Sequence, residues 1–128
     1  MLKVLVADAL PVFRAGIKEI LFEEFTFVYF DEASDGPSLL EKVKAQKWDI
    51  IIADLAIHNH VTETINQILR LKPRPHILIL SSDEDTQCTT EIISKVTVSL
   101  LSKKTTVDQL IKALQGILTN QDYTVTSS

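Results

Sequence analysis

Residues 48–54 read Trp-Asp-Ile-Ile-Ile-Ala-Asp, a short apolar run that ends in the carboxylate of Asp54. Uninterrupted β-branched residues between polar neighbours predict a strand that is buried on both faces. Such strands occur mostly in parallel sheets that are covered by helices. Because folds of this class bind ligands beyond the carboxyl ends of their strands, we expect the chemistry of this chain at Asp54.

The composition fits one soluble globular domain. The 128 residues are 45% apolar and 23% charged, and a chain of this length can bury a core without disulfides. The net charge is −4, without a basic block that would bind nucleic acid. No apolar run is long enough for a membrane span, the amino-terminal one is too short for a signal peptide, and Cys88 is the only cysteine. We expect a cytoplasmic protein that neither enters a membrane nor binds nucleic acid by this chain alone.

Strand and helix patterns alternate along the chain. The expected strands cover residues 2–7, 25–30, 48–54, 76–80 and 97–101. The expected helices begin at Pro11, after Asp35, before Ile65, in residues 83–95 and after Thr106. Right-handed crossovers then predict an α/β, (βα)5 flavodoxin-like three-layer sandwich with a parallel five-stranded sheet in the order 2-1-3-4-5. We expect residues 1–119 to form this domain and residues 120–128 to be a polar tail or the start of a linker.

Three local expectations accompany these elements. Helical spacing in the first helix predicts a buried apolar stripe, with Arg14 between its members on the solvent-facing side. The aromatic residues of 25–30 are expected to pack in the core. Thr106 and Gln109 have the spacing of a capping box at the start of the last helix.

In this strand order, the strands that precede Asp8 and Asp54 are neighbours, and Ser81 and Lys103 follow the next two strands at the same rim. Magnesium takes one or two carboxylates and fills its other positions with water and phosphate oxygens. A carboxylate can itself accept a phosphoryl group as an acyl phosphate, and a lysine and a hydroxyl can bind the phosphoryl oxygens. The four side chains together therefore suit a phosphoryl group and a magnesium ion.

At these positions the sequence resembles the response regulator receiver domain of bacterial two-component signalling, in the subclass that usually carries a LuxR-type helix-turn-helix. The resemblance rests on residues 3–8, 11–16, 32–36, 49–54, 77–82 and 100–103. It implies that Asp54 is the phosphoacceptor and that Asp8, Asp54 and the backbone carbonyl of Ala56 hold Mg²⁺. It further implies that Ser81 and Lys103 contact the phosphoryl group.

The same resemblance implies partners. A sensor histidine kinase would donate the phosphoryl group, and transcription would be controlled through a DNA-binding domain outside this chain. A homodimer would form through the face made by the fourth helix, the fifth strand and the fifth helix. The chain would then be a phosphoacceptor signalling domain, with no enzyme activity beyond its own phosphorylation and dephosphorylation.

Several positions depart from the family pattern. Ala9 stands where the family has a second acid, which weakens or removes the magnesium site, and Leu100 stands where it has an aromatic residue. Residues 57–62 replace a segment that usually contains proline and glycine. These departures favour an alternative, a phosphorylation-independent pseudo-receiver that acts as an interaction or dimerisation module. A purely structural reading is also open, in which the four rim residues are helix caps, a turn residue and a solvated charge: Asp8, Asp54, Ser81 and Lys103.

An enzyme that uses Asp54 as a hydrolytic nucleophile is a third class. Aspartate-dependent phosphatases resemble Asp-x-Asp at the strand end, and Ala56 in the third position argues against turnover of external substrates. The tripeptide of residues 58–60, His-Asn-His, resembles a nuclease motif only by coincidence. Its two histidines have no third soft ligand nearby in sequence for a transition metal.

Overall fold

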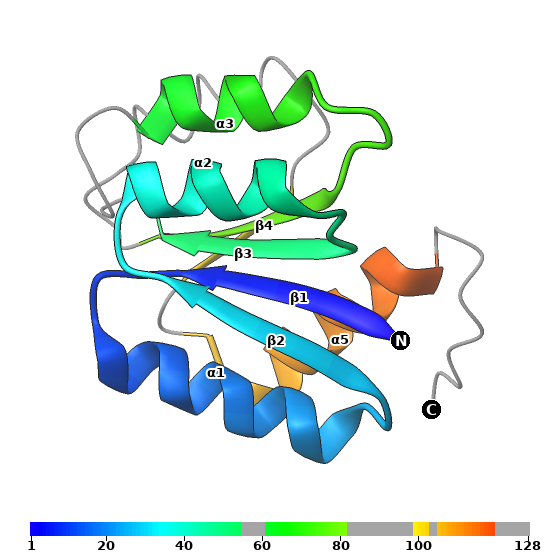
Figure 1. Ribbon diagram of the computed structural model, residues 1–128. Coiled ribbons are helices and arrows are strands. Elements are labelled where there is room, and N and C mark those ends of the chain that lie inside the picture. The colour runs from blue at the N-terminus through cyan, green and yellow to red at the C-terminus, as the bar shows by residue number, and fades with distance from the viewer. Residues whose placement is uncertain (55–60, 82–98, 103–104, 120–128) are drawn as a thin grey trace.

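The strands form one parallel sheet in the order β2-β1-β3-β4-β5, as expected (Figure 1). The computed structural model describes residues 1–54, 61–81, 99–102 and 105–119. The strands are β1 (Leu2–Ala7), β2 (Val28–Ala33), β3 (Ile50–Asp54), β4 (His76–Ser81) and β5 (Ser99–Ser102). The helices are α1 (Pro11–Glu24), α2 (Gly36–Ala45), α3 (Val61–Leu69) and α5 (Val107–Thr119). The helix expected in residues 83–95 lies outside the described residues.

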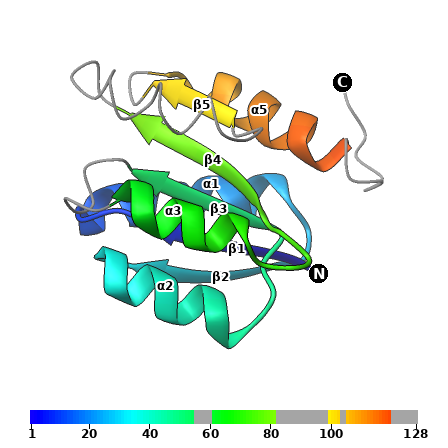
Figure 2. The same ribbon diagram turned by 90° about the horizontal axis from the view of Figure 1, so that it is seen from above.

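Helices cover both faces of the sheet. Helices α1 and α5 lie on one face, and α2 and α3 lie on the other (Figures 1 and 2). Successive side chains of a strand point to opposite faces, so Val4 and Val6 pack with the α1 and α5 core while Leu5 and Ala7 pack with the α2 and α3 core. All five residues of β3 are buried. This two-sided burial explains why the strand reads as an unbroken apolar run.

Local signals at the helix starts are confirmed. Pro11 occupies the first turn of α1, where its missing N–H has no cost. Asp35 is the N-cap of α2, and its Oδ1 accepts a hydrogen bond of 2.8 Å from the Ser38 backbone N–H. At the start of α5 the Gln109 N–H donates to Thr106 Oγ1 (3.2 Å), and the Thr106 N–H donates to Gln109 Oε1 (3.1 Å). These two reciprocal bonds form the expected capping box. In the described part of the chain, no helix has the length and apolar character of a membrane span.

The position of β2 is the main correction to the expected elements. The strand begins at Val28 and ends at Ala33, three residues later than residues 25–30 at each end. Phe25 instead closes α1, since its N–H donates to the Leu21 carbonyl at 3.0 Å. The strand includes the charged Asp31 and Glu32, which an edge strand tolerates because its outer side is open to solvent. The other strands differ from expectation by two residues or fewer at each described end.

The aromatic residues around β2 do not all pack in the core, contrary to expectation. Phe27 is 71% exposed, and Tyr29 is 40% exposed. The Tyr29 ring lies against Trp48, with 5.7 Å between the ring centroids. Phe25 and Phe30 are partly buried against the α1 and α5 core. The edge position of β2 explains this division, since only part of its surface faces a helix layer.

Candidate functional site

Asp8 and Asp54 lie at neighbouring strand ends. The β1–β3 register pairs Ala7 with Ala53, so Asp8 and Asp54, the next residues of the chain, lie at the same rim. Figure 1 shows the carboxyl ends of β1 and β3 at the same edge of the sheet. The Asp8 N–H donates to the Ala33 carbonyl at 3.0 Å, which extends the β1–β2 ladder by one residue. Both aspartates are buried, with exposed fractions of 1% for Asp8 and 7% for Asp54. The convergence that the strand order predicted is therefore present.

The Asp8 side chain is held by the turn that follows it. Its Oδ1 accepts a hydrogen bond of 2.8 Å from the Leu10 backbone N–H. Leu10 occupies the N-cap position of α1, and its own side chain makes no capping bond. The Asp8 carboxylate binds the backbone N–H of this N-cap residue, so Asp8 lies at the entry to the helix without being the N-cap.

Arg14 belongs to this region, although helical spacing predicted it on the solvent-facing side of α1. Its side chain is only 14% exposed instead of lying in solvent. Its Nη1 donates to the Asp8 backbone carbonyl at 2.6 Å, and its Nε donates to Glu32 Oε1 at 2.8 Å. The sequence does contain one signal that Arg14 and Glu32 belong to the site, because both lie within the stretches that carry the family resemblance.

The other expected site residues are placed only in part. Asp54 pairs with Leu80 in the β3–β4 register, so Ser81 ends β4 one position further along the same rim. Ser81 pairs in turn with Ser102 at the end of β5. Lys103 and Ala56 lie outside the described residues, as do residues 57–60.

The donor set at the rim fits a magnesium ion. Two buried carboxylates at neighbouring strand ends match the one or two that Mg²⁺ takes from proteins. Ala9 is exposed beside Asp8 and supplies no side-chain ligand. Among the residues placed in the structure, no three histidine, cysteine or acidic side chains gather into a metal-binding group.

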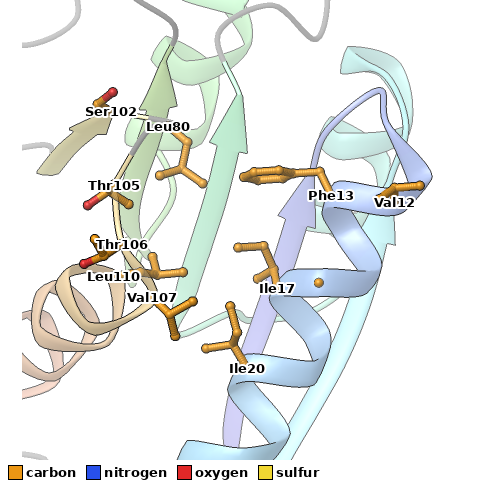
Figure 3. Close-up of a pocket in the computed structure, with 11 residues that line it drawn as sticks. Val12, Phe13, Ile17, Ile20, Leu80, Ser102, Thr105, Thr106, Val107 and Leu110 are labelled. Atoms are coloured by element: carbon orange, nitrogen blue, oxygen red, sulfur yellow. The ribbon is translucent and has the colours of Figure 1, made fainter.

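An apolar pocket of about 270 Å³ opens beside this rim, between α1 and the start of α5 (Figure 3). Phe13 points into it towards Leu80, and Ile17 and Ile20 line the α1 side. Ser102, Thr105 and Val107 line the opposite side. Val12 at the edge of the pocket is 85% exposed.

Comparisons with known proteins give the family. The model of the response regulator receiver domain matches residues 4–115. The chain is 24% identical over 123 residues to the transcriptional regulatory protein DegU of Brevibacillus brevis, covering 95% of this chain and 52% of DegU. It is 26% identical over 124 residues to the oxygen regulatory protein NreC of Staphylococcus carnosus, covering 95% of this chain and 57% of NreC. The chain thus spans about half the length of these relatives.

Solved structures show the same fold. A response regulator RcsB–DNA complex superimposes with a TM-score of 0.79 at 21% identity, covering 98% of this chain and 64% of RcsB. The chemotaxis response regulator CheY4 of Vibrio cholerae also gives 0.79, at 23% identity, covering 92% of this chain and 99% of CheY4. Receiver domains generally bind Mg²⁺ and interact with histidine kinases. This chain belongs to the response regulator receiver domain family, a family of signalling domains in two-component systems.

Proposed function

We propose that Asp54 accepts a phosphoryl group from a phosphohistidine of a sensor histidine kinase. The observation that carries this proposal is the pair of buried carboxylates, Asp8 and Asp54, at neighbouring strand ends. An Asp54 oxygen attacks phosphorus, an acyl phosphate bond forms, and the P–N bond to histidine breaks. The histidine nitrogen keeps the electron pair of that bond and takes up a proton, so the imidazole leaves in its neutral form.

Neighbouring groups support this step. Asp8, Asp54 and the backbone carbonyl of Ala56 would hold the magnesium ion, with weaker affinity than a site that has an acid at position 9. A bound magnesium ion neutralises charge on phosphoryl oxygens. Ser81 and Lys103 would contact those oxygens by a hydroxyl and an ammonium group. The apolar pocket beside the rim, with exposed Val12, gives a kinase an apolar contact area next to the acceptor.

The test is an intact-mass spectrum of the protein after incubation with acetyl phosphate, with and without Mg²⁺. We expect the wild-type chain to gain one phosphoryl group only when Mg²⁺ is present. Asp54→Asn should gain none, because an amide oxygen is a much weaker nucleophile than a carboxylate. Asp49→Asn is the matched control, since Asp49 immediately precedes β3 and lies at the opposite end of that strand from Asp54. Labelling of Asp54→Asn would show that another residue is the acceptor.

The alternative is a pseudo-receiver that binds a partner without phosphorylation. It is favoured by Ala9, which leaves the rim with two carboxylates among the residues placed in the structure. The same experiment separates the two functions. A folded wild-type chain that stays unlabelled, while another receiver domain is labelled in parallel, supports the pseudo-receiver.

The output is proposed to be transcription, through a DNA-binding domain that follows residues 1–119 and a linker that begins in residues 120–128. DegU and NreC are regulatory proteins of which this chain covers only 52% and 57%, which supports the proposal. A further relative has the name of an enzyme and not of a transcription regulator. The chain is 29% identical over 126 residues to a protein-glutamate methylesterase/protein-glutamine glutaminase of Vibrio parahaemolyticus, of which it covers 32%.

The location is proposed to be the cytoplasm, where a kinase of this kind would phosphorylate it.

A homodimer is the second proposed partner state. Its face would combine β5 and α5 with the expected fourth helix, which lies outside the described residues. Addition of a charged phosphoryl group would shift the balance between two arrangements of this face. Sedimentation velocity before and after phosphorylation measures this, and an unchanged sedimentation coefficient in fully phosphorylated protein would contradict it.

A further inference from the structure

We infer that Arg14 is a positioning residue that orients Asp8 for magnesium binding. The inference rests on the proposed function, because the proposed function places the magnesium site at Asp8 and Asp54. The guanidinium joins the Asp8 backbone carbonyl, at the end of β1, to the Glu32 carboxylate on β2. Arg14 itself stays outside the reacting atoms and acts through Asp8.

Hydrogen bonds to described residues hold Asp8 through its backbone N–H, its backbone carbonyl and its side chain. Its backbone N–H donates to the Ala33 carbonyl at 3.0 Å, which fixes the end of the strand. Its backbone carbonyl accepts from Arg14 Nη1 at 2.6 Å, and its Oδ1 accepts from the Leu10 N–H at 2.8 Å. The Arg14 bond sets the direction of the peptide group between residues 8 and 9. That direction brings the Leu10 N–H to the carboxylate, so Arg14 controls the side chain through the backbone.

The geometry requires arginine rather than any positive charge. Two nitrogens of one planar group reach two acceptors on different elements, with Nε on Glu32 and Nη1 on Asp8. A lysine has a single nitrogen at the end of its chain and cannot keep both bonds in this geometry. The Arg14 side chain is 14% exposed and that of Glu32 is 43% exposed, whereas Asp8 is buried. The bond from Arg14 to the Asp8 carbonyl is therefore better shielded from water than the Arg14–Glu32 ion pair.

Ala9 makes the orientation of Asp8 more important. A second acid at position 9 would give the metal an additional ligand that tolerates small shifts of Asp8. With Ala9, the described rim offers the carboxylates of Asp8 and Asp54. Groups that orient metal ligands commonly affect metal affinity by about 10- to 100-fold when they are removed.

The test is a Mg²⁺ titration of the ¹⁵N-labelled chain, followed by the backbone amide shifts of Ala9 and Leu10. We expect Arg14→Gln and Arg14→Lys each to raise the Kd for Mg²⁺ by on the order of tenfold. Glu32→Gln should have a smaller effect, because its amide oxygen still accepts from Nε. Lys18→Gln is the matched control and should leave the Kd unchanged, since Lys18 lies one turn later on α1 and contacts the Phe22 and Phe30 rings instead.

Several outcomes would overturn the inference. They are an unchanged Kd in Arg14→Gln, a wild-type Kd in Arg14→Lys, and a wild-type chain that shows no saturable Mg²⁺ binding. Well-dispersed amide spectra, compared at a temperature well below unfolding, ensure that folded proteins are compared. Failure of the proposed function is separate, because it appears as absent labelling by acetyl phosphate in the mass spectrum while the Mg²⁺ titration still reports on Arg14.

Discussion

His76 connects the stability of the chain to pH. It is the first residue of β4, and its N–H donates to the Asp49 carbonyl at 3.1 Å. Burial is the main cause that lowers the pKa of His76, the positive charge of Arg74 lowers it further, and Asp49 opposes both. In the unfolded chain the pKa of His76 is near the ordinary histidine value of 6.5, so the unfolded chain binds a proton at His76 more tightly than the folded chain.

The stability contribution of neutral His76 is complete above the unfolded pKa and is lost as the pH falls through the folded pKa. We expect the wild-type free energy of unfolding to fall more between pH 7.5 and pH 5.5 than that of His76→Gln. Urea unfolding at several pH values measures the difference. Because the other titratable groups are shared, parallel curves for the two proteins would contradict the prediction.

At the residue scale, the sequence identified carboxylates at strand ends but not the group that holds them. Asp8 and Asp54 could be predicted because each follows an apolar strand and the topology alone brings the strand ends together. The helical pattern alone could not place Arg14 at this site, because one of its two acceptors is a backbone carbonyl, which is common to every residue. Helical periodicity gives the direction of a Cβ atom, whereas the long arginine side chain bends back over the end of β1.

At the scale of the elements, Gly16 is the residue in the interior of α1 with the lowest intrinsic helix propensity. Glycine in a helix interior costs about 0.5–1 kcal/mol relative to alanine, because the unfolded chain loses more conformational freedom. A Cβ added at Gly16 would meet nothing within 4 Å, since this residue lines the pocket beside α1. We expect Gly16→Ala to raise the free energy of unfolding by about 0.5–1 kcal/mol.

Gly116 gives a matched test in another helix. It lies within α5, and an added Cβ there also meets nothing within 4 Å. Chemical denaturation of both alanine variants should show similar gains. A loss of stability in Gly16→Ala alone would mean that the added methyl group takes up pocket space that a neighbouring side chain or a partner needs.

The accuracy of the predicted elements depended on their place in the sheet. Central β1 and β3 carry apolar runs because both of their faces are covered, so their ends were located to within two residues. Edge strand β2 contains Asp31 and Glu32, which interrupt the apolar pattern. Their charges are paired with Lys42 and Arg14, from the two helices that flank this strand. The alternating apolar and polar pattern that predicts a strand does not reveal ion pairs with other elements.

For the whole molecule, the proposed magnesium binding would be linked to folding through the rim. A ligand that binds only the folded chain stabilises it by RT ln(1 + [L]/Kd). Asp8 and Asp54 are already two buried carboxylates in a chain of net charge −4. A third acid beside them would increase repulsion without the metal and would add a ligand with it. Position 9 is exposed, so a larger side chain can be placed there.

We therefore expect Ala9→Asp to be less stable than wild type in the presence of EDTA and to gain more stability from Mg²⁺. Each tenfold decrease in Kd adds about 1.4 kcal/mol to the free energy of unfolding at saturating Mg²⁺. Urea unfolding at several Mg²⁺ concentrations measures both effects. Ala9→Asn is the matched control, because it adds similar volume without the charge. If the two variants gain equally from Mg²⁺, the charge at position 9 does not contribute to the metal site, and Ala9 cannot explain weak magnesium binding.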